Sequence, residues 1–281
     1  MHSMESAKKH SPGNPFSLAG RTVLITGGTQ GVGGAIARSI AEAGGDLVIH
    51  GLRDDSSARD TLSACRECGV GAELLIADLI PEPLSDSARH VAETLCREAL
   101  RINPHIDSLV NNAGTYLDGD FLDTTSEIFY RTFQLNVAAG LFLTRALVAS
   151  WLSSSIAGRI VFTGSINGLL SEAEHVCYDA SKGAVAAMVR SLCAELAPRG
   201  IRVNAMAPGL VITPMTQIIE KEPAFRSWME IHTPNRRVPN ATVCGPPTVF
   251  LLSDAAEHIH GQTLYVDGGM SAWQQPSPPA Q

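Results

Sequence analysis

The sequence is short of charge and of lysine, and both shortages narrow the possible functions. Charged residues make up 17% of the 281 residues, the net charge is −7, and the only lysines are at positions 8, 9, 182 and 221. No basic run is long enough to follow a phosphate backbone, so we expect no nucleic-acid partner. The length and an apolar content of 44% fit a globular chain that can bury a large core.

Long hydrophobic runs are missing as well. No apolar run reaches the ~20 residues of a membrane helix, so we expect no membrane association. The first fifteen residues are polar and contain no apolar segment of the kind found in secretory signals. We therefore expect a cytoplasmic protein, with residues 1–17 as a disordered leader and the Pro- and Gln-rich residues 274–281 as a disordered tail.

The six cysteines form no pattern typical of a metal site or of a disulfide framework. Cys65 and Cys68 are the only close pair, and a zinc ribbon would need a second pair at matching spacing. We interpret both as ordinary helix residues and expect reduced thiols, as in a cytosolic protein. No metal is expected.

Short β-branched apolar runs alternate with helical patterns along the chain. Strands separated by helices of ten or more residues predict an α/β fold, a doubly wound, mostly parallel, Rossmann-like sheet with helices on both faces. With no linker-like break and no internal repeat, residues 18–273 are expected to form a single domain. The expected strands are 21–26, 46–50, 72–77, 106–110, 159–163, 201–207 and 262–266. The expected helices are 35–43, 56–68, part of 83–103, two stretches of 125–155 around Asn136, 176–198 and 240–252.

A glycine-rich turn, residues 27–34, joins the first strand to the first helix. This arrangement presents backbone N–H groups and a helix N-terminus to a pyrophosphate. In parallel sheets, ligands bind beyond the carboxyl ends of the strands. The residues at those ends are polar or conformationally special, and their gathering predicts a nucleotide-dependent enzyme. They are Gly27, His50, Asp78, Asn111, Ser165 and Pro208.

Tyr178 and Lys182 are four residues apart and lie on one face of an expected helix. A free phenol has a pKa of about 10, and a nearby ammonium would lower the pKa of Tyr178 toward the working range. Ser165 follows the fifth strand and can place a hydroxyl beside the phenol. Together the three can hold a carbonyl oxygen and exchange a proton with it. The alternative is a half-buried tyrosine beside a solvated lysine, but the scarcity of lysine favours a chemical role.

Residues 18–269 resemble the short-chain dehydrogenase/reductase family in its short, single-domain form. The joint order and spacing of several motifs carry the resemblance. They are TGxxxGxG at Thr26, Gly27, Gly31 and Gly33, NNAG at Asn111 to Gly114, Ser165 with YxxxK at Tyr178 and Lys182, and the additional matches Asn136, Asn204, Pro208-Gly209 and Val266-Asp267-Gly268-Gly269.

The resemblance implies an NAD(P)(H)-dependent oxidoreductase that transfers a hydride between nicotinamide and a secondary alcohol or carbonyl of a small substrate. Tyr178 would be the acid–base and Ser165 would polarise the carbonyl. Lys182 would bind the nicotinamide ribose and lower the pKa of the tyrosine. Asn136 would anchor a water that links the lysine to solvent; the alternative is a buried amide that serves only the backbone.

The resemblance also implies which residues contact the cofactor, and each assignment has a structural alternative. Asp78 and Leu79 would bracket the adenine, although Asp78 could be only a helix cap. Thr213 would hold the carboxamide, although it could be only a turn residue. The full set is Gly27, Thr29, Gln30, Gly31, Val32, Gly33, Arg53, Asp78, Leu79, Asn112, Ala113, Gly114, Tyr178, Lys182, Pro208, Gly209, Val211 and Thr213.

The end of the second strand favours NADP over NAD. The acid that would accept from a ribose 2′-OH is missing, because Gly51 stands at its position. Arg53 is close enough in sequence to pair with a 2′-phosphate. Two observations oppose a preference for NADP. Gln30 stands where many NADP enzymes of the family carry a basic residue, and Asp54 and Asp55 could neutralise Arg53.

The substrate cannot be named from the sequence, but part of its pocket can. Ser165, Asn167, His175 and Tyr178 are expected to face it, next to a stretch, residues 215–232, that we expect to be mobile. Glu172, Glu174 and His175 make one wall polar, which suggests a sugar, a polyol or a small hydroxy compound; a 3-oxoacyl substrate stays open.

Two other functions are possible on this fold. One is a non-catalytic nucleotide-binding regulator, and the other is an epimerase or dehydratase of the extended family form. The presence of Ser165, Tyr178 and Lys182 favours the oxidoreductase over the regulator. The chain length and the glycine spacing argue against the extended form.

The segment 125–155 predicts a homo-oligomer, a tetramer with dihedral symmetry. Its helical pattern is apolar around much of the circumference, and exposed apolar stripes of this size usually mark an interface. Burial in the monomer's own core is the alternative. The stripe comprises Leu135, Val137, Leu141, Phe142, Leu143, Leu147, Val148 and Trp151.

Overall fold

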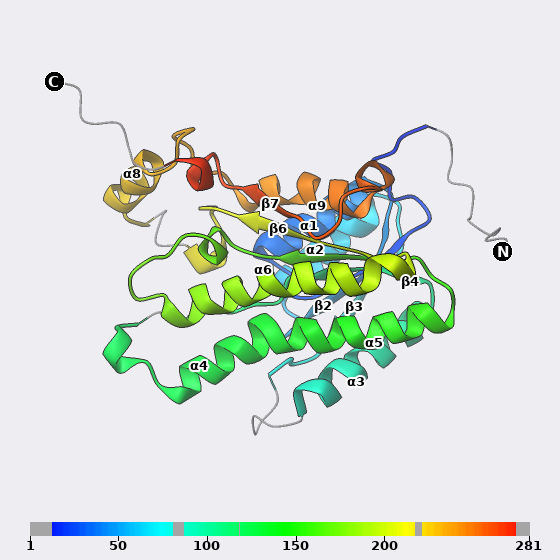
Figure 1. The fold of residues 1–281 in the computed structure, drawn as a ribbon. Helices are drawn as coiled ribbons and strands as arrows, with labels where there is room; N and C mark the ends of the chain where they lie inside the picture. Colours follow the sequence, from blue (N-terminus) through cyan, green and yellow to red (C-terminus); the bar gives the residue numbers. More distant parts are fainter. Residues whose placement is uncertain (1–12, 81–86, 118, 217–220, 274–281) are drawn as a thin grey trace.

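The computed structural model describes residues 13–80, 87–117, 119–216 and 221–273, and it contains a seven-stranded, fully parallel sheet (Figure 1). The strand order is β3-β2-β1-β4-β5-β6-β7. Strands β2 and β3 are added on one side of β1, and β4 to β7 are added on the other, so the strand order reverses between β1 and β4. The predicted doubly wound α/β fold is confirmed. The strands are β1 (Thr22–Ile25), β2 (Asp46–Gly51), β3 (Ala72–Ile76), β4 (Ile106–Asn111), β5 (Arg159–Thr163), β6 (Arg202–Pro208) and β7 (Thr263–Val266).

Helices cover both faces of the sheet, as Figure 1 shows. One face packs against α3 (Ser87–Ile102), α5 (Ala139–Ser153) and α6 (Val176–Leu196). The other packs against α1 (Gly31–Glu42), α2 (Ser56–Glu67) and α9 (Gly245–Leu252). Side chains alternate between the two cores along each strand. In β1, Leu24 joins the first core, while Val23 and Ile25 join the second.

Helix α4 (Ser126–Phe133) continues through a π-helix, Gln134–Ala138, into α5. This matches the prediction of two helical stretches around Asn136. The joined helix, Ser126–Ser153, is long and apolar enough to cross a membrane by length and composition alone. Its inner side packs in the core through Leu143, Leu147 and Trp151, as in a core helix of a globular protein.

Three arginines at the amino edge of the sheet fasten α9 to it. Arg202 donates to the carbonyl oxygens of Leu251 at 2.8 Å and of Ser253 at 2.9 Å, where the helix ends. Asp254, which follows α9, pairs with Arg159 and with Arg21 at 3.4 Å, and Arg21 also pairs with Asp107 of β4 at 2.9 Å. Burial is the main cause that lowers the pKa of Arg202, to about 10. Cations placed here stabilise the carboxyl end of a helix dipole.

Three features differ from the sequence predictions. Helix α1 begins at Gly31, inside the glycine turn. Within the stretch expected to be mobile, Pro223–Ile231 forms α8, and residues 217–220 lie outside the described residues. Residues 13–17, part of the expected leader, make defined contacts: the N–H of Ala255 donates to the carbonyl of Pro15 at 2.9 Å. Residues 1–12 and 274–281 lie outside the described residues. The 3-10 turns are Phe121–Asp123, Ile166–Gly168, Ala197–Arg199, Pro214–Thr216, Ala241–Cys244, Asp254–Ala256 and Met270–Ala272.

Trp151 fixes α5 against the sheet, and replacing it tests this packing. Its side chain is 0% exposed, and its Nε1 donates to the carbonyl of Ile106 at 2.7 Å. We expect Trp151→Ala to lower the free energy of unfolding by about 3–5 kcal/mol, measured in urea, because it opens a cavity and orphans that carbonyl. The same truncation at Trp228, which is 46% exposed, should cost less. Equal losses at the two positions would contradict this assignment.

Candidate active site

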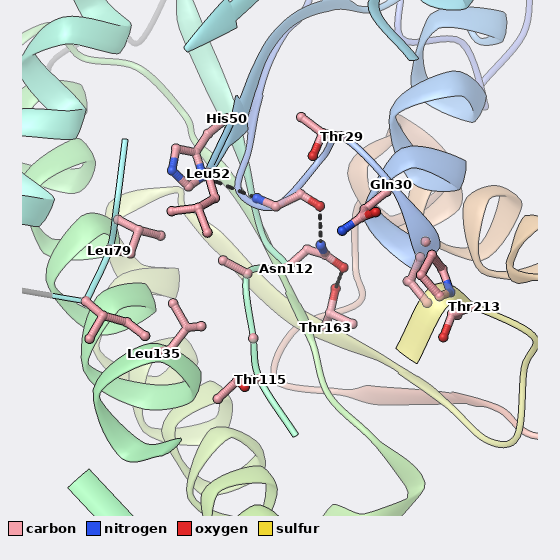
Figure 2. A pocket seen from close by; sticks show the side chains of 18 of the residues that line it. Thr29, Gln30, His50, Leu52, Leu79, Asn112, Thr115, Leu135, Thr163 and Thr213 are labelled. Carbon is pink, nitrogen blue, oxygen red and sulfur yellow. Dashed lines mark hydrogen bonds between the residues drawn. The ribbon is translucent and has the colours of Figure 1, made fainter. Parts of the chain in front are cut away.

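A cavity of about 350 Å³ opens at the carboxyl edge of the sheet, at the point where the strand order reverses (Figure 2). This is the position at which ligands bind in open α/β sheets. Most of the predicted cofactor residues line it, from the glycine turn to the YxxxK helix. They are Gly27, Thr29, Gln30, Gly31, Val32, Gly33, Asp78, Leu79, Asn112, Ala113, Gly114, Tyr178, Lys182, Pro208 and Thr213.

The glycine turn is shaped for close approach. A Cβ on Gly33 would lie 2.0 Å from the carbonyl oxygen of Gly27, so no larger residue fits there. Gln30 precedes α1 without a side-chain cap, which leaves the first N–H groups of the helix for another acceptor. This is the arrangement that accepts a pyrophosphate.

Asn112 joins three strands beneath the cavity. Its Nδ2 donates to the carbonyls of Thr26 at 3.1 Å and Gly27 at 3.0 Å, and its Oδ1 accepts from Thr163 Oγ1 at 3.1 Å. In Figure 2 a dashed line joins Asn112 to the hydroxyl of Thr163. The glycine turn after β1 is thereby tied to the ends of β4 and β5.

Tyr178 and Lys182 project from α6 toward the cavity, as their spacing predicts. Lys182 is 7% exposed, and its Nζ donates to the carbonyl of Thr163 at 3.1 Å and lies 5.5 Å from the centre of the Tyr178 ring. Ser165 is buried beside them, its Oγ donates to Asn167 Oδ1 at 3.3 Å, and its hydroxyl near the phenol acts to lower the pKa of Tyr178. The structure therefore brings the three predicted catalytic side chains together.

The pKa of Tyr178 differs from the sequence prediction. Burial raises it, the hydrogen bond from Ser165 lowers it, and the carboxylates of Asp179 and Glu172 raise it further. Burial also lowers the pKa of Lys182, to about 8. The expected lowering of the phenol pKa by the ammonium is therefore wrong for this arrangement, because loss of solvation dominates at both groups.

The side chain of Asn136 joins the segment after β4 to α6, and its expected role in anchoring a water stays a prediction. Its Oδ1 accepts from the N–H of Thr115 at 2.8 Å. Its Nδ2 donates to the carbonyl of Thr115 and to Ser181 Oγ, both at 3.0 Å. Both amide hydrogens are therefore engaged, and the side chain braces the segment after β4 against α6.

A polar cluster lies beside the catalytic group. Asn167 Nδ2 donates to Glu172 at 3.1 Å and to Asp179 at 2.8 Å, and its backbone N–H donates to Ser165 Oγ at 3.1 Å. His175 Nδ1 pairs with Glu172 at 3.1 Å, and its Nε2 contacts the Tyr116 hydroxyl. The predicted substrate residues Asn167 and His175 thus share one hydrogen-bonded network that reaches Ser165.

Some predicted residues lie elsewhere, and some lining residues were not predicted. Arg53 is exposed, and its neighbour Leu52 lines the cavity instead; Gly209 and Val211 lie outside the lining. Sequence reasoning did not select His50 and Thr163 as site residues, although both line the cavity. Their position at the ends of β2 and β5 was the available signal.

Comparisons with known proteins agree with this architecture. A family model described as enoyl-(acyl carrier protein) reductase matches residues 27–271. Over 256 residues, 91% of this chain and 94% of the relative, the chain is 32% identical to a glucose 1-dehydrogenase of Gluconobacter oxydans (strain 621H).

A second relative and a solved structure extend the agreement. The chain is 31% identical to 5-keto-D-gluconate 5-reductase of Escherichia coli (strain K12), over 91% of this chain and 97% of the relative. A crystal structure of gluconate 5-dehydrogenase from Burkholderia cenocepacia J2315, in complex with NADP and tartrate, superposes with a TM-score of 0.84 at 28% identity, covering 92% of this chain and 98% of the other. The chain therefore belongs to the short-chain dehydrogenase/reductase family.

Proposed function

We propose that residues 18–273 act as one domain that interconverts a secondary alcohol and a carbonyl on a sugar, sugar acid or polyol, with NADP(H) as hydride carrier. The observation that carries this proposal is that Tyr178 and Lys182 line the cavity beside the glycine turn, with Ser165 next to Tyr178. The relatives named for glucose and 5-keto-D-gluconate support the substrate class. A non-catalytic regulator has no use for all three groups.

The chain's own residues supply the proton chemistry. The nicotinamide supplies or accepts the hydride when bound. Tyr178 gives its proton to the carbonyl oxygen in reduction and removes it from the hydroxyl in oxidation. Ser165 donates a hydrogen bond to the same oxygen, and Lys182 keeps a positive charge beside the phenol. The raised pKa of Tyr178 keeps the phenol protonated at neutral pH, the form that reduction requires.

The polar cluster beside Ser165 supports a polyhydroxylated substrate over a 3-oxoacyl one. Glu172, Asn167 and His175 expose charged and amide groups at the wall that an alkyl chain would have to cross. Removing such groups from water against a hydrocarbon costs free energy, whereas sugar hydroxyls can replace the lost water contacts.

The end of β2 supports NADP. A Cβ at Gly51 would lie 2.4 Å from Cγ2 of Thr29, so an acidic side chain there would require Thr29 to shift. The two carboxylates that could have neutralised Arg53 are engaged: Asp54 pairs with Arg59 at 2.8 Å, and Asp55 caps α2 through the N–H of Ala58 at 3.0 Å. Arg53 makes no ion pair within the described residues and is left for a 2′-phosphate.

We propose a homotetramer in the cytoplasm. Part of the predicted apolar stripe, including Leu143, Leu147 and Trp151, is used in the monomer's own core. In the most apolar 18-residue stretch of the joined helix, however, only 39% is buried within the monomer. Phe129 and Tyr130 of α4 are exposed. All six cysteines are free thiols, which supports a reducing compartment.

Tyr178→Phe should abolish turnover and spare cofactor binding. The change removes a proton donor and little volume, and the loss of acid–base catalysis lowers kcat by ~10²–10⁴-fold. The assay is oxidation of D-gluconate and D-glucose with NADP, alongside the cofactor Kd. Tyr130→Phe, which removes an exposed hydroxyl in α4, is the matched control. A Tyr178→Phe enzyme with half the wild-type rate would refute the role.

NADP should bind more tightly than NAD, and Arg53 should account for part of the difference. A charge-assisted contact to phosphate is worth about 1.5–3 kcal/mol, so Arg53→Ala should weaken NADP at least tenfold and leave NAD nearly unchanged. Titration calorimetry with both cofactors measures this. The control is Arg66→Ala, which removes a half-exposed arginine from the last turn of α2, where it pairs with Glu73. Tighter NAD binding, or a constant ratio, would disprove the assignment.

The protein should have four times the 29.8 kDa chain mass in solution. An exposed apolar helix face of this extent favours association. Light scattering at micromolar concentration gives the mass directly. A monomer at that concentration contradicts the proposal.

A further inference from the structure

His50 is a buried histidine at the end of β2, and both hydrogen bonds of its ring are to backbone atoms. It is 3% exposed and lines the cavity. Its Nδ1 accepts from the N–H of Gly27 at 3.2 Å, and its Nε2 lies 3.1 Å from the carbonyl oxygen of Ala77. Figure 2 shows the ring pointing toward the glycine turn.

These two partners fix the tautomer. A backbone N–H can only donate, so Nδ1 must be the acceptor, and a carbonyl can only accept, so Nε2 must carry the hydrogen. The imidazole therefore has to be neutral. Burial lowers the pKa of His50 and outweighs Asp78, which raises it, so the ring is held in the required state.

Both partners belong to residues that line the cavity, one after β1 and one after β3. Gly27 begins the glycine turn, and Ala77 directly precedes Asp78 and Leu79. The backbone carbonyl of His50 also accepts from the N–H of Gly28 at 2.9 Å, so this residue holds two successive residues of the turn. Through Asn112 and Thr163, the same hydrogen-bonded series continues to Lys182.

We propose that His50 is a positioning residue for the nicotinamide cofactor. The neutral imidazole of His50 sets the distance between the glycine turn and the end of β3. It acts through Gly27 and Ala77 by fixing these two segments before the cofactor enters. The inference rests on the proposed cofactor-dependent function. An exposed or purely space-filling histidine would bond to neither segment.

Three substitutions separate positioning from packing. His50→Asn places an acceptor near the position of Nδ1, and His50→Gln places a donor near the position of Nε2. His50→Leu roughly keeps the side-chain volume but has neither a donor nor an acceptor. Titration calorimetry with NADP and no substrate gives the Kd, and thermal unfolding gives Tm. We expect His50→Asn and His50→Gln, which each keep one of the two contacts, to bind NADP more weakly than the wild type, and His50→Leu to bind about tenfold or more weakly than the wild type.

The order of the variants decides the matter. The inference is overturned if His50→Leu binds NADP as tightly as the wild type or as either of the two variants that keep one contact. If His50→Leu does not fold, the inference is overturned when both His50→Asn and His50→Gln bind NADP as tightly as the wild type. A wild type that binds neither NADP nor NAD overturns the proposed function together with this inference. A wild type that binds NADP with no dependence on residue 50 overturns the inference alone.

Discussion

The amide of Asn112 is the contact on which the cavity depends. Where the strand order reverses, the chains leaving β1 and β4 turn to opposite sides and open a gap in the sheet edge. That gap is where a ligand can enter, but it also removes the backbone pairing that would hold the two ends together. The Asn112 amide bridges the gap with bonds to Thr26, Gly27 and Thr163, and the Thr26 hydroxyl accepts from the N–H groups of Asn112 and Ala113, both at 3.0 Å. Cavity and scaffold thus coexist because side-chain hydrogen bonds take the place of backbone pairing there.

The two edges of the sheet are stabilised by different chemistry. At the amino edge, three arginines meet carboxylates and helix carbonyls, and full charges are kept. At the carboxyl edge, burial opposes charge at His50, Tyr178 and Lys182 alike, although Lys182, with a pKa of about 8, stays mostly protonated at neutral pH. The raised pKa of Tyr178 keeps its proton in place until a substrate oxygen arrives.

The sequence predicted the features that depend on local patterns. Strands, most helices and the Ser165–Tyr178–Lys182 group follow from periodicity and spacing over fewer than twenty residues. The unpredicted contacts join distant positions: His50 reaches Gly27 and Ala77, and Asn112 reaches Gly27 and Thr163. Arg53 was placed by proximity in sequence, but the side chain that lines the cavity is Leu52. The predicted direction of the pKa shift of Tyr178 was wrong because motif spacing carries no information about burial.

The π-helix at Gln134–Ala138 has a consequence for how this chain tolerates changes in length. A π-turn holds one residue more than an α-turn, so the segment is in effect an insertion kept inside a helix. Deleting one residue there would let α4 and α5 fuse as a regular helix, because the extra residue that the π-turn absorbs would be gone. Asn136 would then swing away from Thr115 while the core face of α5 stayed in place. A segment inside regular secondary structure would thus behave as a fixed-length spacer, whereas surface loops of the same fold can lengthen freely.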